Sequence, residues 1–451
     1  MYSNRTGVTP DEVYHDVYPV WTYSYLCVLV LVFLFTDILK YKVVIVLEGF
    51  AYILTWVLLT WARGLFAMQM MQVAYGVATS TEVAYFTYIY ARVPGEQYQK
   101  VTSFTRAALL FGRFLSGVLS QVLVGFGLTE VLELNYISLA MVTMATLVSF
   151  LLPSVTNTIY FHRDTSGVSD VQGSECDSIS TLEKCRKALL LVKRDFVNSF
   201  SNLYILKWSL WWALATCGNF QVITGIFSFG LFQPFYPTKC NIREKSVKRT
   251  VQVGNYTQAL WDEIQPEAEA GELYNGAVEA TATLLGAVLA LILGFAKFNW
   301  SLIGDLSLAV ICLLDAVVLY LMGASHSIWM GYAGYIVFRS LYQMMITVAS
   351  FEVARRISET SYGLVFGFNT FLALGLQTIL TTIVASSAGL ALSPPAQFQV
   401  YGGCFLVMGL VFILSGGLTM ARGGLADLRR EGIWRSDESE DCYISVNQIS
   451  S

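Results

Sequence analysis

Charged residues are scarce in this 451-residue chain. Asp, Glu, Lys and Arg make up 13% of it, whereas 55% is hydrophobic and the mean hydropathy is +0.56. A soluble protein of this length carries about 25% charged residues. The apolar residues form repeated blocks of about 20, the length that a helix needs to cross the hydrocarbon core of a bilayer. This pattern excludes a soluble globular protein and predicts an all-α polytopic membrane protein.

Motifs for catalysis and metal binding are missing as well. Three histidines are too few for a metal site, and the eight cysteines show no CxxC or metal-ligand spacing. We interpret the cysteines as free thiols in apolar surroundings. The chain also lacks a phosphate-binding Gly-Lys-Ser/Thr, a nucleophile elbow and a basic stripe of the size that nucleic acid requires. We therefore expect no enzyme activity, no metal, no cofactor and no nucleic-acid partner.

Eleven apolar segments qualify as membrane-spanning helices. They cover residues 19–36, 43–62, 66–90, 101–126, 134–152, 207–232, 273–297, 301–322, 328–350, 363–387 and 397–421. A polar stretch divides the spans five and six, and helical spacing over 182–200 in it is typical of a helix on the membrane surface. The predicted organisation is an external segment 1–18, a bundle 19–155, a cytosolic linker 156–206, a bundle 207–421 and a cytosolic tail 422–451.

The distribution of Lys and Arg predicts the orientation. Alternate loops carry basic residues, whereas 127–133, 323–327 and 388–396 contain none. Because basic loops stay in the cytosol, the amino terminus is predicted outside and the carboxyl terminus inside. Residues 236–253 break this rule, since they place five basic residues on the predicted outer face.

Several strings resemble the reduced folate and thiamine carrier family. They are PVWTYSYL at 19–26, TDILKYK at 36–42, AYFTYIY at 84–90, YQKVTS at 98–103, WSLWWA at 208–213, YNGAVEA at 274–280, LVFGFNT at 364–370 and QFQVY at 397–401. The strings are colinear and cover nearly the whole chain. The resemblance implies a fold like the major facilitator superfamily, with two helical bundles around a central solute cavity and transport by alternating access.

The chain departs from this family pattern in two places. The family's first helix has no counterpart, which agrees with eleven spans and an external start. Asn4, in Asn4-Arg5-Thr6, occupies the position of an external glycan acceptor. Residues 223–253 separate two strings, 218–222 and 254–261, that adjoin each other in the family's seventh helix. This insert is either a true external loop or an intron retained in the gene prediction, and we favour the intron.

Glu82 is the leading candidate for substrate binding. An ionisable side chain inside a membrane span costs about 2.5–3.5 kcal/mol, so such residues are functional candidates. At helical spacing Tyr75, Glu82 and Tyr85 are predicted to lie within a stripe on one helix face. Each aromatic ring contributes about 0.5–2 kcal/mol to binding a cation. A carboxylate beside such rings suits a buried organic cation. The structural alternative is an internal ion pair of Glu82 with Arg106 or Arg113.

The resemblance also separates candidate substrates. Folate carriers have an arginine at the position of Glu82 and a lysine at that of Gln377, which suits an anionic ligand. A carboxylate and a neutral amide suit the thiamine cation, so this chain looks like the thiamine branch. The alternatives are a carrier of folate or another vitamin, and a non-transporting truncated isoform or paralogue.

Other candidates extend the proposed substrate site. They are Tyr18, Trp21, Gln72, Tyr75, Tyr85, Asn255, Tyr256, Trp261, Tyr274, Asn275, Glu279, Tyr342 and Asn369. By resemblance, Tyr18, Trp21 and Tyr75 match positions that stack on the vitamin, and Gln72 replaces a usual glutamate. Each tyrosine alone is more typical of core packing or an interfacial belt.

Three more charged residues are predicted to act in gating or structure. Asp37 lies in a turn that resembles the superfamily's charged loop after helix two. Arg106 and Arg339, one in each half, match basic positions of the family. We expect them to form gating or structural ion pairs, with Glu48 or Asp315 as partners, rather than to contact the substrate.

Overall fold

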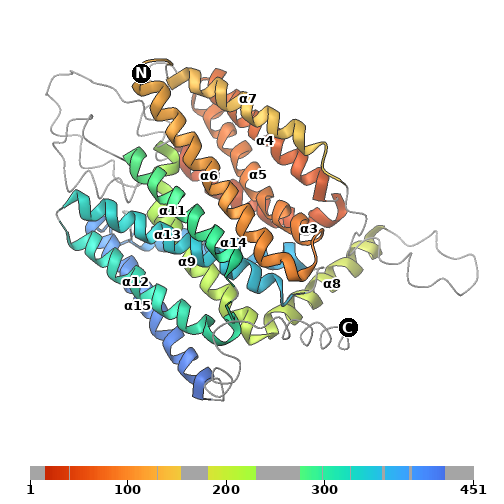
Figure 1. The fold of residues 1–451 in the computed structure, drawn as a ribbon. Coiled ribbons are helices and arrows are strands. Elements are labelled where there is room, and N and C mark those ends of the chain that lie inside the picture. Colours follow the sequence, from red (N-terminus) through yellow and green to blue (C-terminus); the bar gives the residue numbers. More distant parts are fainter. Residues whose placement is uncertain are drawn as a thin grey trace, which may run out of the picture.

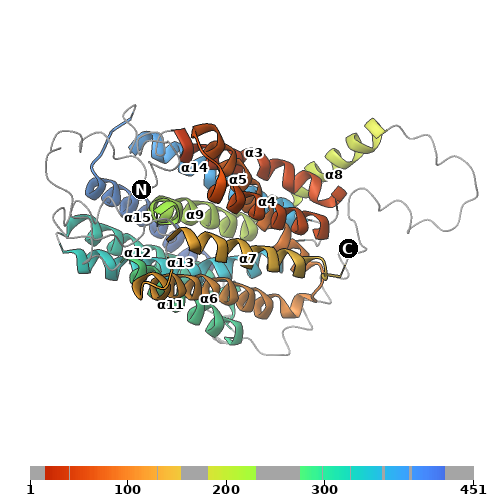
Figure 2. The same cartoon turned by 90° about the horizontal axis from the view of Figure 1, so that it is seen from above.

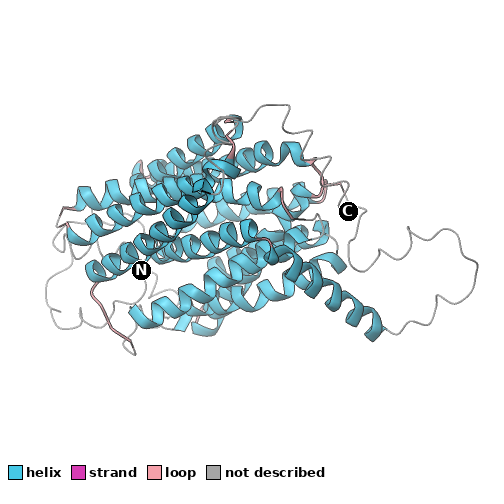
Figure 3. Cartoon of the chain, turned by 90° about the horizontal axis from the view of Figure 1, so that it is seen from below, coloured by secondary structure: helices cyan, strands magenta, loops and turns pink. Residues whose placement is uncertain are grey.

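The computed structural model describes residues 16–39, 41–129, 131–153, 181–229, 275–296, 298–325, 327–357, 361–384 and 389–421. The first half contains α3 (Tyr18–Leu39), α4 (Tyr41–Trp61), α5 (Leu65–Tyr90), the short η2 (Gly95–Gln97), α6 (Tyr98–Gly125) and α7 (Val131–Ser149). After α8 (Thr181–Ser201) follow α9 (Leu203–Phe229), α11 (Asn275–Phe295), α12 (Trp300–Ala324), α13 (Ile328–Ala354), α14 (Tyr362–Val384) and α15 (Pro394–Thr419). Each predicted segment coincides with one long helix, and α8 is the helix predicted in the linker (Figure 3).

Six of these helices are long and apolar enough to cross a membrane by length and composition. They are α4, α6, α11, α12, α14 and α15. Two fully described helices outside this set, α5 and α13, carry ionisable side chains, Glu82 and Arg339, within their length. Polar groups of this kind lower the mean hydropathy of a helix that faces protein rather than lipid. The other predicted spans are not among these six helices, so the total of eleven spans remains a prediction.

The helices form two halves that meet along two seams. Helices α3–α7 gather on one side, and α9 with α11–α15 gather on the other (Figures 1 and 2). One seam is made by α6 lying along α11, and the other by α3 lying along α14. Helices α13 and α5 add contacts to α6 and α14, respectively, so the polar helices lie near the centre.

Glycines allow α12 and α15 to approach closely in the second half. Gly402, Gly409 and Gly416 recur every seven residues on α15. A Cβ added at Gly402 would lie 3.0 Å from the Ala316 carbonyl oxygen, and one at Gly409 would lie 3.0 Å from Leu313. Small residues at a membrane helix interface permit this packing, since van der Waals contact replaces the hydrophobic effect there.

A buried ion pair joins three helices of the same half. Lys207 Nζ of α9 lies 2.5 Å from Asp305 Oδ2 of α12, and the side chain of Asp305 is 8% exposed. Ser415 and Thr419 of α15 donate hydrogen bonds to the same oxygen at 2.9 and 3.2 Å. The carboxylate is therefore satisfied from α9 and α15, which fixes the two helices against α12.

Tyrosines connect the two halves at the end where α6 and α14 begin. The hydroxyl groups of Tyr98 and Tyr362 are 2.6 Å apart and buried. The ring of Tyr90 lies 5.0 Å from Tyr98 and 5.4 Å from Tyr362. At the same end, Gln99 Nε2 donates to the carbonyl oxygens of Leu293 and Ala296, the last turn of α11. This end, predicted to be cytosolic, is closed in the structure.

The predicted insert falls mostly outside the described residues. Helix α9 continues through Phe229, seven residues past the predicted boundary at residue 222. The remainder of the segment, 230–253, lies outside the part of the chain that the structure describes.

Candidate functional site

Aromatic rings from α3, α4 and α5 gather in the first half. Trp21 of α3 lies 6.0 Å from Tyr75 of α5 and 5.7 Å from Tyr25 one turn along its own helix. Tyr52 of α4 lies 6.3 Å from Tyr75 in an edge-to-face arrangement. The indole nitrogen of Trp21 donates a hydrogen bond to Thr79 Oγ1 at 3.2 Å, which orients the ring. Trp21 and Tyr75, both predicted to line the substrate site, therefore lie close together.

Glu82 lies on the same helix as Tyr75, seven residues further along. Its carboxylate interacts electrostatically with Tyr25 and Tyr75, and across the seam with Tyr342 of α13. Glu82 is absent from the ion pairs recorded for the described residues. The guanidinium of Arg106 instead lies over the Phe86 ring, 4.9 Å from its centroid. A carboxylate that interacts electrostatically with phenol groups is suited to attract an organic cation.

In the second half, two side chains of α13 hold the carboxylate of Glu279. Tyr335 donates a hydrogen bond to Glu279 Oε2 at 2.6 Å, and Arg339 Nη2 lies 3.4 Å from Oε1 of the same side chain. Arg339 also donates to Asn219 Oδ1 of α9 at 2.9 Å. Glu279 is thus engaged by protein groups, in contrast to Glu82.

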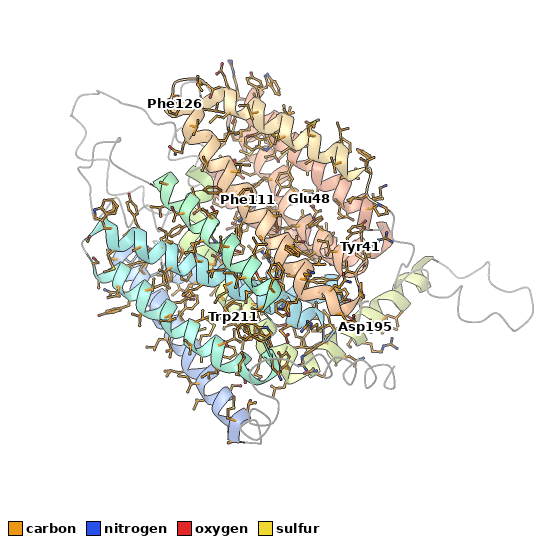
Figure 4. The ribbon with its side chains drawn as sticks, viewed as in Figure 1. Tyr41, Glu48, Phe111, Phe126, Asp195 and Trp211 are labelled. Carbon is orange, nitrogen blue, oxygen red and sulfur yellow. The ribbon has the colours of Figure 1, made fainter. Side chains whose placement is uncertain are left out.

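Arg106 and Arg339 do not form ion pairs with the acidic residues that were predicted as their partners. Arg339 pairs with Glu279, and neither Glu48 nor Asp315 forms a recorded ion pair with Arg106 or Arg339. Asp315 is 2% exposed and its Oδ1 accepts no hydrogen bond from the described residues. Glu48 projects from α4 among the first-half helices (Figure 4) and interacts electrostatically with Glu82. The prediction of Glu48 or Asp315 as partner was wrong for Arg339 because contacts between helices are not encoded in spacing along one helix.

Two further candidate tyrosines, Tyr85 and Tyr342, contact other protein side chains. Tyr85 packs against a cluster of Tyr41 and Ile45 of α4 and Tyr88 of α5. Tyr342 is buried, and its hydroxyl lies 3.1 Å from Thr216 Oγ1.

Three amide side chains complete the set of described candidates. Asn369 is 1% exposed and donates to Ser209 Oγ of α9 at 3.2 Å. Gln72, on the same helix as Tyr75, and Gln377 of α14 are both buried.

Some predicted residues cannot be placed. Asn4, Asn255, Tyr256, Trp261 and Tyr274 lie outside the described residues. For Tyr18, Asp37 and Asn275 the structure describes the helix backbone but not the side chain.

Sequence reasoning missed several residues that take part in these clusters. Tyr25 follows Trp21 by four residues, and Tyr335 precedes Arg339 by four, so each lies on the same helix face as a predicted residue. That spacing was a usable signal. For Asn219 of α9, 120 residues from Arg339, no local signal exists.

Comparisons with known proteins agree with this arrangement. The human protein "Thiamine transporter 1" is 38% identical over 450 residues, covering 92% of this chain and 84% of its own. The crystal structure of the human organic anion transporter MFSD10 superposes with a TM-score of 0.60 at 12% identity, covering 91% of this chain and 87% of that one. That of FucP, a major facilitator superfamily transporter in the outward conformation, gives 0.54 at 13% identity, covering 88% of each.

The last two likenesses show that the fold is that of the major facilitator superfamily. The sequence profile of the reduced folate carrier family matches residues 1–235 and 246–400. This match covers well over half of the chain. It leaves 236–245, within the predicted insert, and 401–451 unmatched. The chain belongs to the reduced folate carrier family.

Proposed function

We propose that this protein is a thiamine carrier that works by alternating access between its two halves. The observation that carries the proposal is the position of Glu82. It is an acidic side chain in the middle of a central helix, beside Tyr75 and Tyr25, and it is not part of a recorded ion pair. Thiamine is a permanent cation, so it can form an ion pair with this carboxylate.

The sign of the charge distinguishes thiamine from folate. Folate is an anion and would meet the carboxylate of Glu82, which lies within α5, in a region of low dielectric. Two like charges repel strongly there, whereas a cation is attracted and its ring stacks on tyrosine and tryptophan. Arg339, the basic residue nearest to Glu279, is neutralised by it and offers little attraction to an anion.

The two seams supply what alternating access requires. The halves touch through α6 with α11 and α3 with α14. The main buried cluster includes residues of both halves, whereas two smaller clusters lie within the first half. Rotation of one half against the other opens one end as it closes the other. The site between Glu82 and Tyr342 spans the halves, so its accessibility changes with this rotation.

We propose that the protein lies in the plasma membrane and that its amino terminus is outside the cell. Asn4 then carries a glycan, and a tag after Ser451 reacts with antibody only in permeabilised cells. Loss of the glycosidase-sensitive band in Asn4→Gln checks the first point. Labelling of the tag on intact cells would contradict the orientation.

Uptake of radiolabelled thiamine and of radiolabelled folate by cells expressing the chain tests the proposal. We expect saturable thiamine uptake that excess unlabelled folate leaves unchanged. Glu82→Gln should raise the Michaelis constant at least tenfold, which corresponds to about 1.4 kcal/mol. The matched control is Glu96→Gln, because Glu96 is exposed in η2 outside the site. Folate uptake without thiamine uptake, at normal surface amounts, would refute the proposal.

A further inference from the structure

Helix α8 differs from the other long helices in its direction. It leaves the bundle beside α9 and α14 and runs crosswise to the membrane-crossing helices (Figures 1 and 2). It belongs to the predicted cytosolic linker and lies at the end closed by Tyr98 and Tyr362. A helix in this direction at the end of a membrane bundle lies along the membrane surface rather than across it.

One side of α8 is fixed to the bundle by aromatic contacts. Phe196 lies 4.9 Å and Phe200 lies 5.3 Å from the ring of Phe368 on α14, both edge-to-face. The two phenylalanines also contact each other at 4.7 Å. This cluster determines which way the helix is turned, and it therefore determines which side chains face outward.

The adjoining side of α8 exposes apolar residues next to cations. Leu190 is 59% and Val197 is 52% exposed, and they lie seven residues apart on one side of the helix. At about 100° per residue this side is roughly a quarter turn from the phenylalanine pair. Lys193 and Arg194 are exposed beside them. Apolar residues flanked by cations are typical of helices that lie at the boundary between lipid headgroups and acyl chains.

We propose that α8 binds anionic lipid of the cytosolic leaflet. Leu190 and Val197 sit at the acyl boundary, and Lys193 and Arg194 contact the negatively charged headgroups. The helix contains five basic and two acidic residues, which favours a negatively charged surface. Arg194 already pairs with Asp195 at 3.6 Å, but Arg194 is 61% exposed, and Figure 4 places Asp195 on α8 close to the bundle. An ion pair this exposed is weak, so the guanidinium of Arg194 remains able to bind a lipid headgroup.

Lipid binding to α8 would also affect α14, because the two helices are in contact. Phe368, which α8 holds, lies on the same helix as Tyr362, the residue that bonds Tyr98 across the halves. Lipid that fixes α8 at the membrane surface therefore also holds the end of α14 that closes the cytosolic side. This inference is independent of which solute the protein carries.

The test places an environment-sensitive fluorescent amino acid at Val197 in the full chain. The protein is reconstituted into vesicles of phosphatidylcholine alone or with phosphatidylserine. We expect emission at shorter wavelength in the vesicles with phosphatidylserine, because the side chain enters the acyl boundary more fully. The same fluorophore at the neighbouring, exposed Asn198 should show a smaller shift, since that residue faces another side of the helix.

Charge variants separate lipid binding by α8 from a general effect of the vesicle. Lys193→Gln together with Arg194→Gln should abolish the phosphatidylserine-dependent shift at position 197. Lys100→Gln, at an exposed cation on α6 near the same end, should preserve it. No phosphatidylserine-dependent shift at position 197, or a shift that the double variant leaves unchanged, would overturn the proposal. The readout needs no transported solute, so it remains valid if thiamine is not the substrate.

Discussion

The hydroxyl groups of Tyr98 and Tyr362 lie 2.6 Å apart, although 264 residues separate them in the chain. One belongs to α6 in the first half and the other to α14 in the second. Both are buried, so neither hydroxyl exchanges its partner for water while this end is closed. The bond therefore contributes to the closed arrangement and is lost when the halves separate.

Removing this bond should favour opening. Tyr98→Phe keeps the ring but removes the hydroxyl, and a net hydrogen bond contributes about 0.5–1.5 kcal/mol. We expect the equilibrium to shift toward the open end by about two- to tenfold. Lys100 and Leu203 are exposed at this end. Distances between spin labels at these two positions, measured by double electron–electron resonance, give the open fraction.

Two controls make this result specific. Tyr98→Phe combined with Tyr362→Phe should cost no more than Tyr98→Phe alone, because Tyr98→Phe already removes the bond between the two hydroxyl groups. Tyr88→Phe removes a bond to the Pro153 carbonyl oxygen within the first half and should leave the distances unchanged. An equal shift in all variants would contradict a specific role for the pair.

Charge reversal tests the sign of the proposed site. Glu82→Arg should abolish thiamine uptake while the protein still reaches the cell surface, because an added positive charge repels the cation in a region of low dielectric. Glu96→Arg makes the same change in exposed η2 and should retain uptake. Normal uptake by the Glu82 variant would mean that this residue neither binds nor attracts the substrate.

The second-half ion pair should matter for stability. Arg339→Gln leaves the Glu279 carboxylate with only Tyr335, and breaking a buried ion pair costs about 3–5 kcal/mol. We expect the lower part of that range, since the Glu279 side chain is 23% exposed. Thermal unfolding of the detergent-solubilised protein measures the loss.

Removing both charges of this pair should be less harmful than removing one. Arg339→Gln with Glu279→Gln leaves no uncompensated charge and should restore part of the melting temperature. Arg194→Gln disrupts only the exposed pair with Asp195 and should have little effect in detergent. A double variant less stable than Arg339→Gln would contradict the pairing.

Neighbouring glycines on α15 provide a matched test of helix packing. Gly402→Val adds a side chain 3.0 Å from the Ala316 carbonyl oxygen, whereas a Cβ at Gly403 meets nothing within 4 Å. Overpacking costs about 1–3 kcal/mol, so Gly402→Val should lower the melting temperature and Gly403→Val should not. Equal melting temperatures would show that α12 can move away from α15 freely.

Most of the helical architecture could be predicted from the sequence. In a bilayer each backbone N–H and C=O must be satisfied within its own segment, so a long apolar run specifies a helix without reference to distant residues. Glu82 was recognisable for a related reason, since an acidic residue inside such a run needs a specific explanation. Helical spacing added Tyr75 to Glu82, whereas Trp21 was added only because its motif resembles a family.

Only the tertiary structure decided which residues meet. Arg339 had several acidic residues available in the sequence, and it pairs with Glu279, 60 residues away, while Asp315 remains buried without a recorded partner at Oδ1. Tyr85, on the same helix as Tyr75, turned toward α4 because of how α4 and α5 pack. Spacing along one helix determines which side chains share a face, but the neighbour of that face depends on the packing of helices far apart in the chain.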